Sequence, residues 1–191
     1  MCYEKLDLLF LDEIVKKLRQ NKIGIFPCDT IYGIIGLLNE PVLEKIYELK
    51  KRPKNNPFLV LIPNITFLDK LAENWSKNFD LTAKHWPGPV TFIFKKNQQV
   101  SNLLTANKPT IGIRLPQFEP LNYILNQLNA PLISTSVNFA KEMPIHSLSN
   151  LAPAMHDYLD FIYFEIAPCL MKESAIIDIS DSEMKIIRGS I

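Results

Sequence analysis

Hydrophobic and polar positions recur along the chain with two different periods, which predict helices and strands in alternation. Apolar residues between Leu8 and Leu18 have the three- and four-residue spacing of an amphipathic helix over residues 8–20. A shorter apolar run, Ile23–Pro27, predicts a buried strand, and another apolar run, Ile34–Leu38, follows after a short polar segment. Strands joined this tightly cannot be parallel, because a parallel crossover needs about a dozen residues. The pattern therefore predicts a mixed sheet.

The same criteria predict the remaining elements. Helices are expected from the cap Asn39 to a stop before Pro53, and at Ile65–Ala72, Leu81–His85, Leu121–Leu128 and Ala152–Leu159. Strands are expected at Phe58–Ile62, Val90–Phe94, Ile111–Leu115, Pro131–Ser136, Phe161–Ile166, Ala175–Ile179 and Met184–Ile187. The polar stretch Lys95–Pro109 predicts a loop or a short excursion. Together these elements predict a single α/β domain over residues 1–191, with an open, twisted sheet of mixed strands and flanking helices.

Composition and charge exclude several classes of protein. The net charge of +1 gives no global field that favours nucleic acid or membrane, so any basic site must be local. The three cysteines are widely spaced and form no CxxC pair, which argues against a disulfide framework or a zinc ribbon. No apolar run approaches the roughly 18 residues of a membrane span, and the acidic N-terminal segment is unlike a signal peptide. A cytoplasmic protein is expected.

Several familiar catalytic and phosphate-binding motifs are absent. The chain contains no G-x-G-x-x-G, no G-x-x-x-x-G-K-[ST], no G-x-S-x-G and no H-E-x-x-H. Its histidines, His85, His146 and His156, lack metal-ligand spacing and are expected on the surface or in loops. Cys28 lies in a polar turn without a histidine nearby in sequence, so a small buried residue is expected there rather than a nucleophile. Any phosphate must therefore be held by side chains and short turns.

Polar residues instead gather at the ends of the predicted strands, where ligands of open α/β sheets bind. They are Asp29, Thr30, Tyr32, Lys50, Arg52, Lys54, Arg114, Ser134, Thr135, Ser136, Asn138 and Arg188. Taken singly, most have a structural explanation: cations complement the end of a helix, and Arg114 could occupy an exposed position of an alternating strand. Together they provide many hydroxyls and cations but few bases. That combination suits a polyanion and a small polar substrate, with catalysis by positioning and charge stabilisation.

Five sequence blocks, in order, resemble the YrdC/Sua5 family of threonylcarbamoyl-AMP synthases. They are Phe26-Pro27-Cys28-Asp29-Thr30-Ile31-Tyr32-Gly33, Leu49-Lys50-Lys51-Arg52-Pro53, Trp86-Pro87-Gly88-Pro89-Val90-Thr91, Ile113-Arg114-Leu115-Pro116 and Ser134-Thr135-Ser136-Val137-Asn138. The family's K-x-R and S-x-N signatures fall on Lys50/Arg52 and Ser136/Asn138. The length resembles the short form of the family, and the fold that the resemblance implies is a YrdC-like open sheet.

The chain departs from the family pattern at four places. Cys28 stands where the family usually has threonine, and Val137 stands where it usually has alanine. Ala140-Lys141 replaces a common serine-glycine pair, and residues 167–172 replace a glycine-rich turn. These departures bear on the shape of the nucleotide pocket more than on the reaction.

The resemblance implies a reaction of L-threonine, bicarbonate or carbon dioxide, and ATP. The products are threonylcarbamoyl-adenylate and pyrophosphate, for the N6-threonylcarbamoyladenosine modification of tRNA. It assigns catalysis to Lys50 and Arg52. It assigns threonine binding to Thr30, Tyr32, Arg52 and Thr135. It assigns ATP binding to Lys50, Lys54, Arg114, Ser134, Ser136, Asn138 and Arg188.

The resemblance also implies partners and leaves two alternatives open. A magnesium ion that bridges the phosphates is expected, with Asp29 and Asp178 as candidate ligands, and the product is expected to pass to a tRNA threonylcarbamoyl-transferase complex. One alternative is a non-catalytic module that binds double-stranded RNA or tRNA, against which the near-neutral charge weighs. The other is a paralogue with another carbamoyl or nucleotide role, such as the domain found in hydrogenase-maturation proteins. Retention of both signature pairs favours the synthase.

Overall fold

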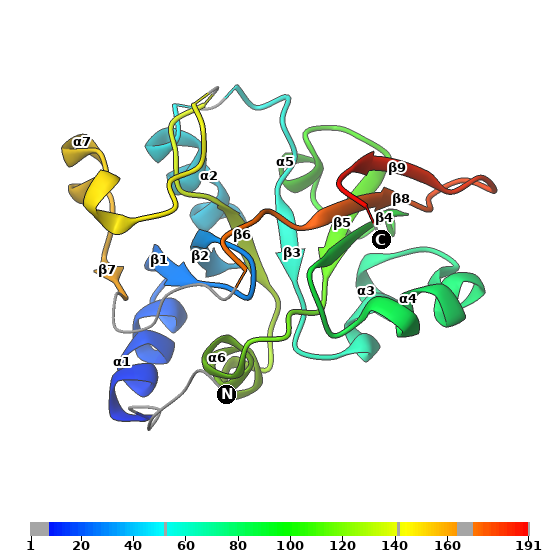
Figure 1. The fold of residues 1–191 in the computed structure, drawn as a ribbon, viewed down its shortest axis with the longest axis horizontal. Coiled ribbons are helices and arrows are strands. Elements are labelled where there is room, and N and C mark those ends of the chain that lie inside the picture. Colours follow the sequence, from blue (N-terminus) through cyan, green and yellow to red (C-terminus); the bar gives the residue numbers. More distant parts are fainter. Residues whose placement is uncertain (1–7, 52, 141, 164–169, 191) are drawn as a thin grey trace.

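Nine strands form one sheet in the computed structural model, which describes residues 8–51, 53–140, 142–163 and 170–190. The strands are β1 Gly24–Pro27, β2 Tyr32–Leu37, β3 Leu59–Leu61, β4 Val90–Lys95, β5 Thr110–Arg114, β6 Leu132–Ser136, β7 Phe161–Ile162, β8 Ala175–Asp178 and β9 Lys185–Arg188. Their spatial order is β7-β1-β2-β6-β3-β5-β4-β8-β9 (Figure 1). Three neighbouring pairs, β1–β7, β3–β5 and β4–β8, are parallel and the other five are antiparallel.

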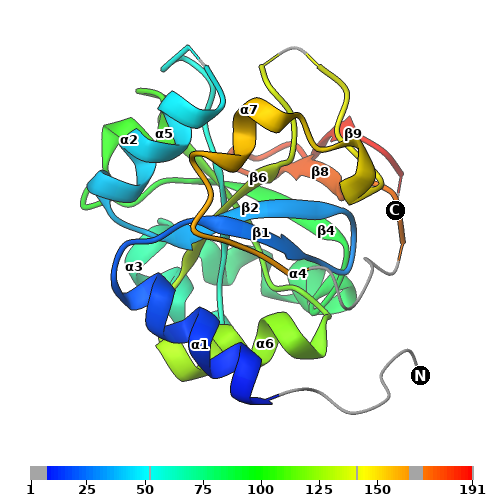
Figure 2. The same ribbon diagram turned by 90° about the vertical axis from the view of Figure 1, so that its left-hand side faces the viewer.

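Helices lie on both faces of this sheet. The α-helices are α1 Leu8–Arg19, α2 Glu40–Leu49, α3 Leu68–Leu71, α4 Phe79–His85, α5 Asn102–Thr105, α6 Glu119–Leu128 and α7 Pro153–His156. The 3-10 helices are η1 Ile65–Phe67, η2 Trp75–Asn78 and η3 Leu148–Asn150. Figure 2 shows α1 and α6 side by side below β1 and β2, with α2 and α7 above them.

Alternate residues of the strands feed two apolar cores, one on each face. Phe26 and Ile35 point to the side of α1 and α6, where they pack with Leu11 and Leu121. Their sequence neighbours on the same strands, such as Ile34, belong to the larger core, which includes the buried face of α2. This is the pattern expected of strands covered on both faces.

Helix α2 begins at the cap that the sequence predicts, but it ends at Leu49, earlier than the predicted stop before Pro53, because Lys51 adopts a positive φ of 48°. The side chain of Asn39 accepts a hydrogen bond from the backbone nitrogen of Val42 at 3.0 Å, and Pro41 lies in the first turn. These features fix the start of the helix. The helix ends at Leu49, and Lys50 is its C-cap. The cap residues therefore place Lys50 at the junction between the helix and the loop that follows.

The predicted mixed sheet with flanking helices is confirmed, and β1 and β2 are antiparallel as expected. Several boundaries differ. β2 begins at Tyr32 rather than Ile34, because the turn after β1 is shorter than its polar sequence suggests. The helix expected at Ile65–Ala72 is a 3-10 turn followed by the short α3. The polar stretch after β4 contains α5.

Two further predictions concern the chain after β6. The helix expected at Ala152–Leu159 is confined to α7, and the strand expected at Phe161–Ile166 is β7 over its first two residues. Residues 164–166 of that expected strand lie outside the described residues. In the part of the chain that is described, no helix is both long and apolar enough to span the thickness of a membrane.

Candidate functional site

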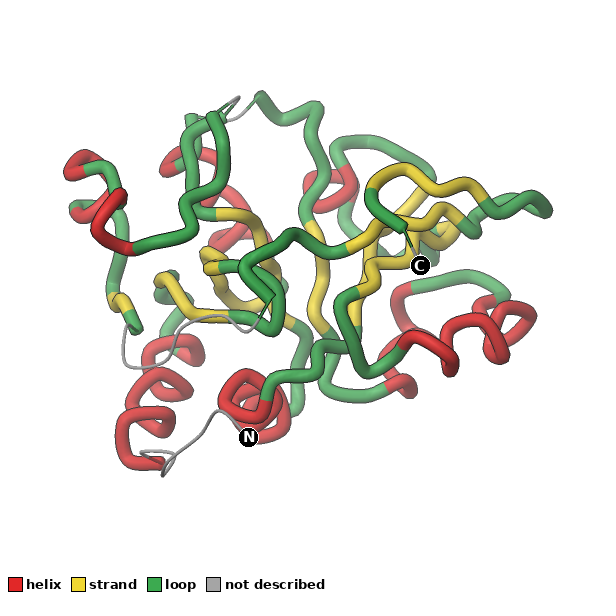
Figure 3. Tube along the Cα trace, in the orientation of Figure 1, coloured by secondary structure: helices red, strands yellow, loops and turns green. Residues whose placement is uncertain are grey.

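A cavity of about 200 Å³ opens where the turn between β1 and β2, the start of β3 and the end of β6 meet. Seven predicted site residues line it: Thr30, Tyr32, Arg114, Ser134, Thr135, Ser136 and Arg188. Figure 3 shows that the segment leading into β8 is a loop crossing in front of the sheet, and Glu173 and Ser174 of that segment also line the cavity. The strand-end polar residues are therefore largely brought together.

Close packing of two strands forms one wall of the cavity. Gly33 of β2 lies opposite Ser136 of β6 in the antiparallel pair. A Cβ atom on Gly33 would lie 3.0 Å from Ser134 Oγ, so the glycine keeps the approach of the two strands open. Ser134 is buried, whereas Thr135 and Ser136 are half-buried. The wall therefore presents hydroxyl groups from a strand that is paired on both sides.

Arg114 is a buried cation at the end of β5, with 2% of its surface exposed. Its Nη1 donates a hydrogen bond to Thr30 Oγ1 at 3.0 Å, and its Nη2 lies 3.2 Å from Asp29 Oδ1. Within the described residues, neither Arg114 Nε nor Asp29 Oδ1 has a hydrogen-bond partner, so the ion pair is close but poorly aligned. An unused N–H of a buried guanidinium beside a cavity is suited to an anionic oxygen.

Lys50 connects α2 to the end of β6 and is also 2% exposed. Its Nζ donates to the backbone oxygen of Ser136 at 2.6 Å and to Asn138 Oδ1 at 2.7 Å. The hydroxyl of Ser136 donates to the same Asn138 oxygen at 2.7 Å. The backbone nitrogen of Ala140 donates to Lys50 O at 3.1 Å. The lysine thus holds the turn after β6. Three of the four residues of the K-x-R and S-x-N signatures, Lys50, Ser136 and Asn138, are therefore in contact.

Arg188 reaches the cavity from β9, the edge strand. Its Nη1 donates to Glu173 Oε1 at 2.5 Å, and its Nε donates to the backbone oxygen of Ser174 at 3.0 Å. The Ser174 hydroxyl is 2.9 Å from that of Thr91 on β4. The sequence analysis assigns no site role to Glu173 or Ser174. The available signal was their position just before the strand Ala175–Asp178, at the same edge as the other polar groups.

Three described site residues, Lys50, Lys54 and Asn138, do not line the cavity, although Lys50 and Asn138 contact Ser136, which does. Lys54 lies in an exposed loop and pairs with Glu44 of α2, with Nζ to Oε2 at 2.6 Å. Arg52, predicted for catalysis and threonine binding, lies outside the described residues. The Nζ of Lys51, the residue after Lys50, lies over the ring of Phe139, 5.1 Å from the ring centroid.

Cys28 lines the cavity as an unreactive thiol. It is buried, and burial raises its pKa to about 12, although the nearby Arg114 acts in the opposite direction. At neutral pH the side chain is therefore a neutral thiol, as expected of a small buried residue rather than a nucleophile. His146 and His156 are exposed, as expected, whereas His85 is half-buried at the end of α4, with its ring centroid 6.1 Å from that of Phe92.

The described side chains do not offer a ready-made magnesium site. In residues 8–51, 53–140, 142–163 and 170–190, no group of three His, Cys, Asp or Glu side chains is placed to hold a metal ion. Asp29 faces Arg114, and Asp178 accepts hydrogen bonds from the backbone and hydroxyl of Ser180 at 2.9 and 2.7 Å. The two candidate carboxylates therefore have other partners.

Comparison with known proteins matches nearly the whole chain to one family. The sequence model of the Sua5/YciO/YrdC family, described as "Telomere recombination", matches residues 16–190. A threonylcarbamoyl-AMP synthase of Pyrococcus abyssi is 26% identical over 166 residues, which are 86% of this chain and 49% of that protein. The threonylcarbamoyl-AMP synthase of Idiomarina loihiensis is 29% identical over 151 residues, or 75% of this chain and 81% of that protein.

The fold also matches a solved structure. The crystal structure of Pyrococcus abyssi Sua5 complexed with L-threonine superposes with a TM-score of 0.90 over 97% of this chain and 55% of that protein. The sequences are 24% identical, so this likeness shows the fold. The chain spans about half the length of the Pyrococcus abyssi relative.

Proposed function

This chain belongs to the Sua5/YciO/YrdC family, and on that basis we propose that it makes threonylcarbamoyl-adenylate and pyrophosphate from L-threonine, bicarbonate or carbon dioxide, and ATP. The observation that carries the proposal is the cavity in which Arg114 and Arg188 lie beside the hydroxyls of Ser134 and Ser136. Cations and hydroxyls that line one cavity suit a polyphosphate, and the remaining space suits a small polar substrate.

In the proposed mechanism, the threonine amine adds to carbon dioxide and loses a proton, which gives a carbamate. A carbamate oxygen then attacks the α-phosphorus of ATP, and pyrophosphate leaves on the opposite side. Negative charge develops on the phosphoryl oxygens and on the leaving group, so fixed cations lower the barrier. Arg114 and Arg188 are the described cations of the cavity, and Arg52 is assigned the same task on the family resemblance.

The remaining groups position the substrates. Thr30, Tyr32 and Thr135 line the cavity and are proposed to shape the threonine pocket. The contacts of Lys50 with Ser136 and Asn138 support a positioning role, because they fix the turn whose polar groups would face the nucleotide. Magnesium is proposed as the ion that accompanies ATP. The proposed setting is the cytoplasm, and the proposed recipient of the product is a tRNA threonylcarbamoyl-transferase complex.

The experiment is to measure pyrophosphate release with ATP, bicarbonate and L-threonine, and to identify the adenylate by mass spectrometry. Release should require L-threonine and should be abolished by Arg52→Ala. The control is Lys108→Gln, which removes an exposed charge outside the cavity and should leave turnover unchanged. Normal turnover by Arg52→Ala would overturn its assignment. Binding of RNA without any binding of ATP or threonine would favour the non-catalytic module.

A further inference from the structure

We propose that Glu173 is a specificity-determining residue of the cavity, and that its carboxylate occupies Arg188 until the phosphates of a nucleotide displace it. This inference rests on the proposed function. It adds that phosphate binding requires an exchange of counter-ions, so that ligands are selected by their charge.

The contacts of Arg188 divide into a fixed set and an exchangeable one. Nε and Nη2 donate to the backbone oxygen and hydroxyl of Ser174, at 3.0 and 3.4 Å. Ser174 is buried and its hydroxyl is 2.9 Å from that of Thr91, which anchors this edge of the guanidinium. Nη1 instead meets Glu173 Oε1 at 2.5 Å, and both residues line the cavity. The remaining donor edge therefore faces a carboxylate at the site where an anion would bind.

The two arginine–carboxylate pairs of the cavity differ in exposure. The side chains of Arg114 and Asp29 are 2% and 5% exposed, whereas those of Arg188 and Glu173 are 41% and 37% exposed. Separating a buried pair leaves an uncompensated charge in a poor solvent, but the partners of an exposed pair are readily hydrated. An entering phosphate should therefore replace Glu173 on Arg188 and leave the Asp29–Arg114 pair intact.

This exchange has a consequence for ligand choice. The displaced carboxylate remains close to the cavity, because it is one residue from the anchored Ser174. It then repels the bound phosphates, and the repulsion grows with the charge on the ligand. Glu173 should accordingly weaken the binding of ATP more than that of ADP or AMP.

The test is titration calorimetry of full-length Glu173→Gln with AMP, ADP and ATP at low and physiological salt. Glutamine keeps the size of the side chain and removes its charge. The affinity for ATP should rise about two- to fivefold, the fold-change that corresponds to an exposed ion pair. The gain should be smaller for ADP, smallest for AMP, and reduced at the higher salt concentration.

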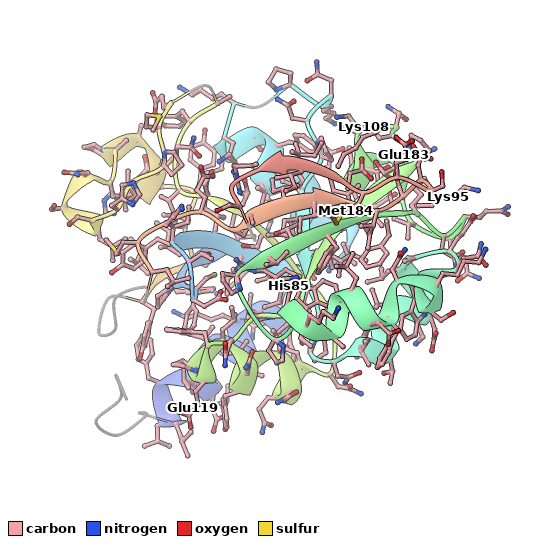
Figure 4. The ribbon with its side chains drawn as sticks, turned by 45° about the vertical axis from the view of Figure 1, so that its right-hand side comes forward. His85, Lys95, Lys108, Glu119, Glu183 and Met184 are labelled. Carbon is pink, nitrogen blue, oxygen red and sulfur yellow. The ribbon has the colours of Figure 1, made fainter. Side chains whose placement is uncertain are left out.

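Two further variants sharpen the test. Glu183→Gln removes the same charge at the tip of the β8–β9 hairpin, away from the lining of the cavity (Figure 4), and should give no comparable gain. Glu173→Asp keeps the charge and should not reproduce the gain of Glu173→Gln.

Three outcomes would overturn the inference while ATP still binds the unmodified protein. They are an unchanged affinity of Glu173→Gln, an equal gain in Glu183→Gln, and weaker ATP binding by Glu173→Gln, which would mean that Glu173 only orients Arg188. If the unmodified protein binds none of the three nucleotides, the proposed function fails and this inference fails with it.

Discussion

The charged side chains in and near the cavity differ in the partners that hold them. Asp29 and Arg114 face each other in the interior, where water cannot replace a lost partner. Lys50 is equally buried but is held by neutral oxygens, those of Ser136 and Asn138. A charge that is fixed before a ligand arrives needs no reorganisation during the reaction. Arg114 therefore combines a structural task with the charge stabilisation proposed for it, and Lys50 combines its structural task with the positioning role proposed for it.

Arg114→Met should destabilise the protein by about 3 to 5 kcal/mol, because it leaves Asp29 buried without its cation. Urea denaturation followed by far-ultraviolet circular dichroism measures this loss. Asp29→Asn combined with Arg114→Met should cost much less than the sum of the two single changes, since neither charge remains. Additive costs would show that the two side chains are not coupled.

Cys28 should resist alkylation in the folded protein. With its pKa raised to about 12 by burial, against 9.0 for an unperturbed thiol, its thiolate fraction at pH 8 is roughly a thousandfold lower than in the unfolded chain. Iodoacetamide labelling followed by peptide mass spectrometry, with and without urea, measures the ratio at this position. The native rate should still be rising with pH at about pH 11, whereas the unfolded rate levels off above about pH 9. Similar native and unfolded rates would contradict the assignment of a buried neutral thiol.

At the scale of single elements, α2 carries Lys50 to the turn after β6. The helix is anchored at its start by Asn39, which accepts from Val42 N at 3.0 Å and donates to Asn21 Oδ1 at 2.7 Å. Its apolar face is buried against the larger core. A change at the first turn therefore tests the anchoring of the helix without touching the cavity.

Asn39→Ala should lower the free energy of unfolding by about 1 to 2 kcal/mol, since the first turn loses its cap and its link to Asn21. Asn39→Ser keeps a capping oxygen but not the amide, so its free energy of unfolding should lie between those of the unmodified protein and Asn39→Ala. The matched control is Asn55→Ala in the exposed loop after the helix, for which little change is expected. Equal midpoints for Asn39→Ala and Asn55→Ala in urea would show that the cap contributes nothing.

At the scale of the whole molecule, the central strands and the edge strands of the sheet contribute differently to stability and to the cavity. β9 forms one edge, and all four of its residues are exposed. It buries little apolar surface, but it supplies Arg188 to the cavity. The edge of the sheet should therefore matter more for nucleotide binding than for stability.

Removal of residues 181–191 should leave the remaining sheet folded and weaken ATP binding about 10- to 150-fold, the range expected for one lost charge-assisted contact. Threonine binding should change little. Arg188→Ala in the full chain is the matched comparison and should give a similar loss. If the truncated chain binds ATP as tightly as the full chain, Arg188 does not contact the nucleotide.

The sequence predicts the elements better than the environment of individual site residues. Periodicity and caps identify α1, α2 and most strands, because those signals are local. Whether Arg114 is buried or exposed could not be decided locally, since its partners Thr30 and Asp29 are more than 80 residues away in the chain. Lys54 was predicted beside the phosphates, yet it pairs with Glu44. Glu173 belongs to no sequence motif, and only its position in the lining of the cavity identifies it.

The position of β6 has a consequence for how substrates would be received. β6 is an interior strand, hydrogen-bonded to β2 on one side and to β3 on the other. Its last three residues, Ser134 to Ser136, line the cavity. The conformational entropy of this backbone is lost when the sheet forms, not when a ligand arrives. Binding at this wall is therefore a docking event onto a surface ordered in advance. The amide protons of the residues paired on both sides, Leu132 to Ser134, should be among the slowest in the molecule to exchange with solvent.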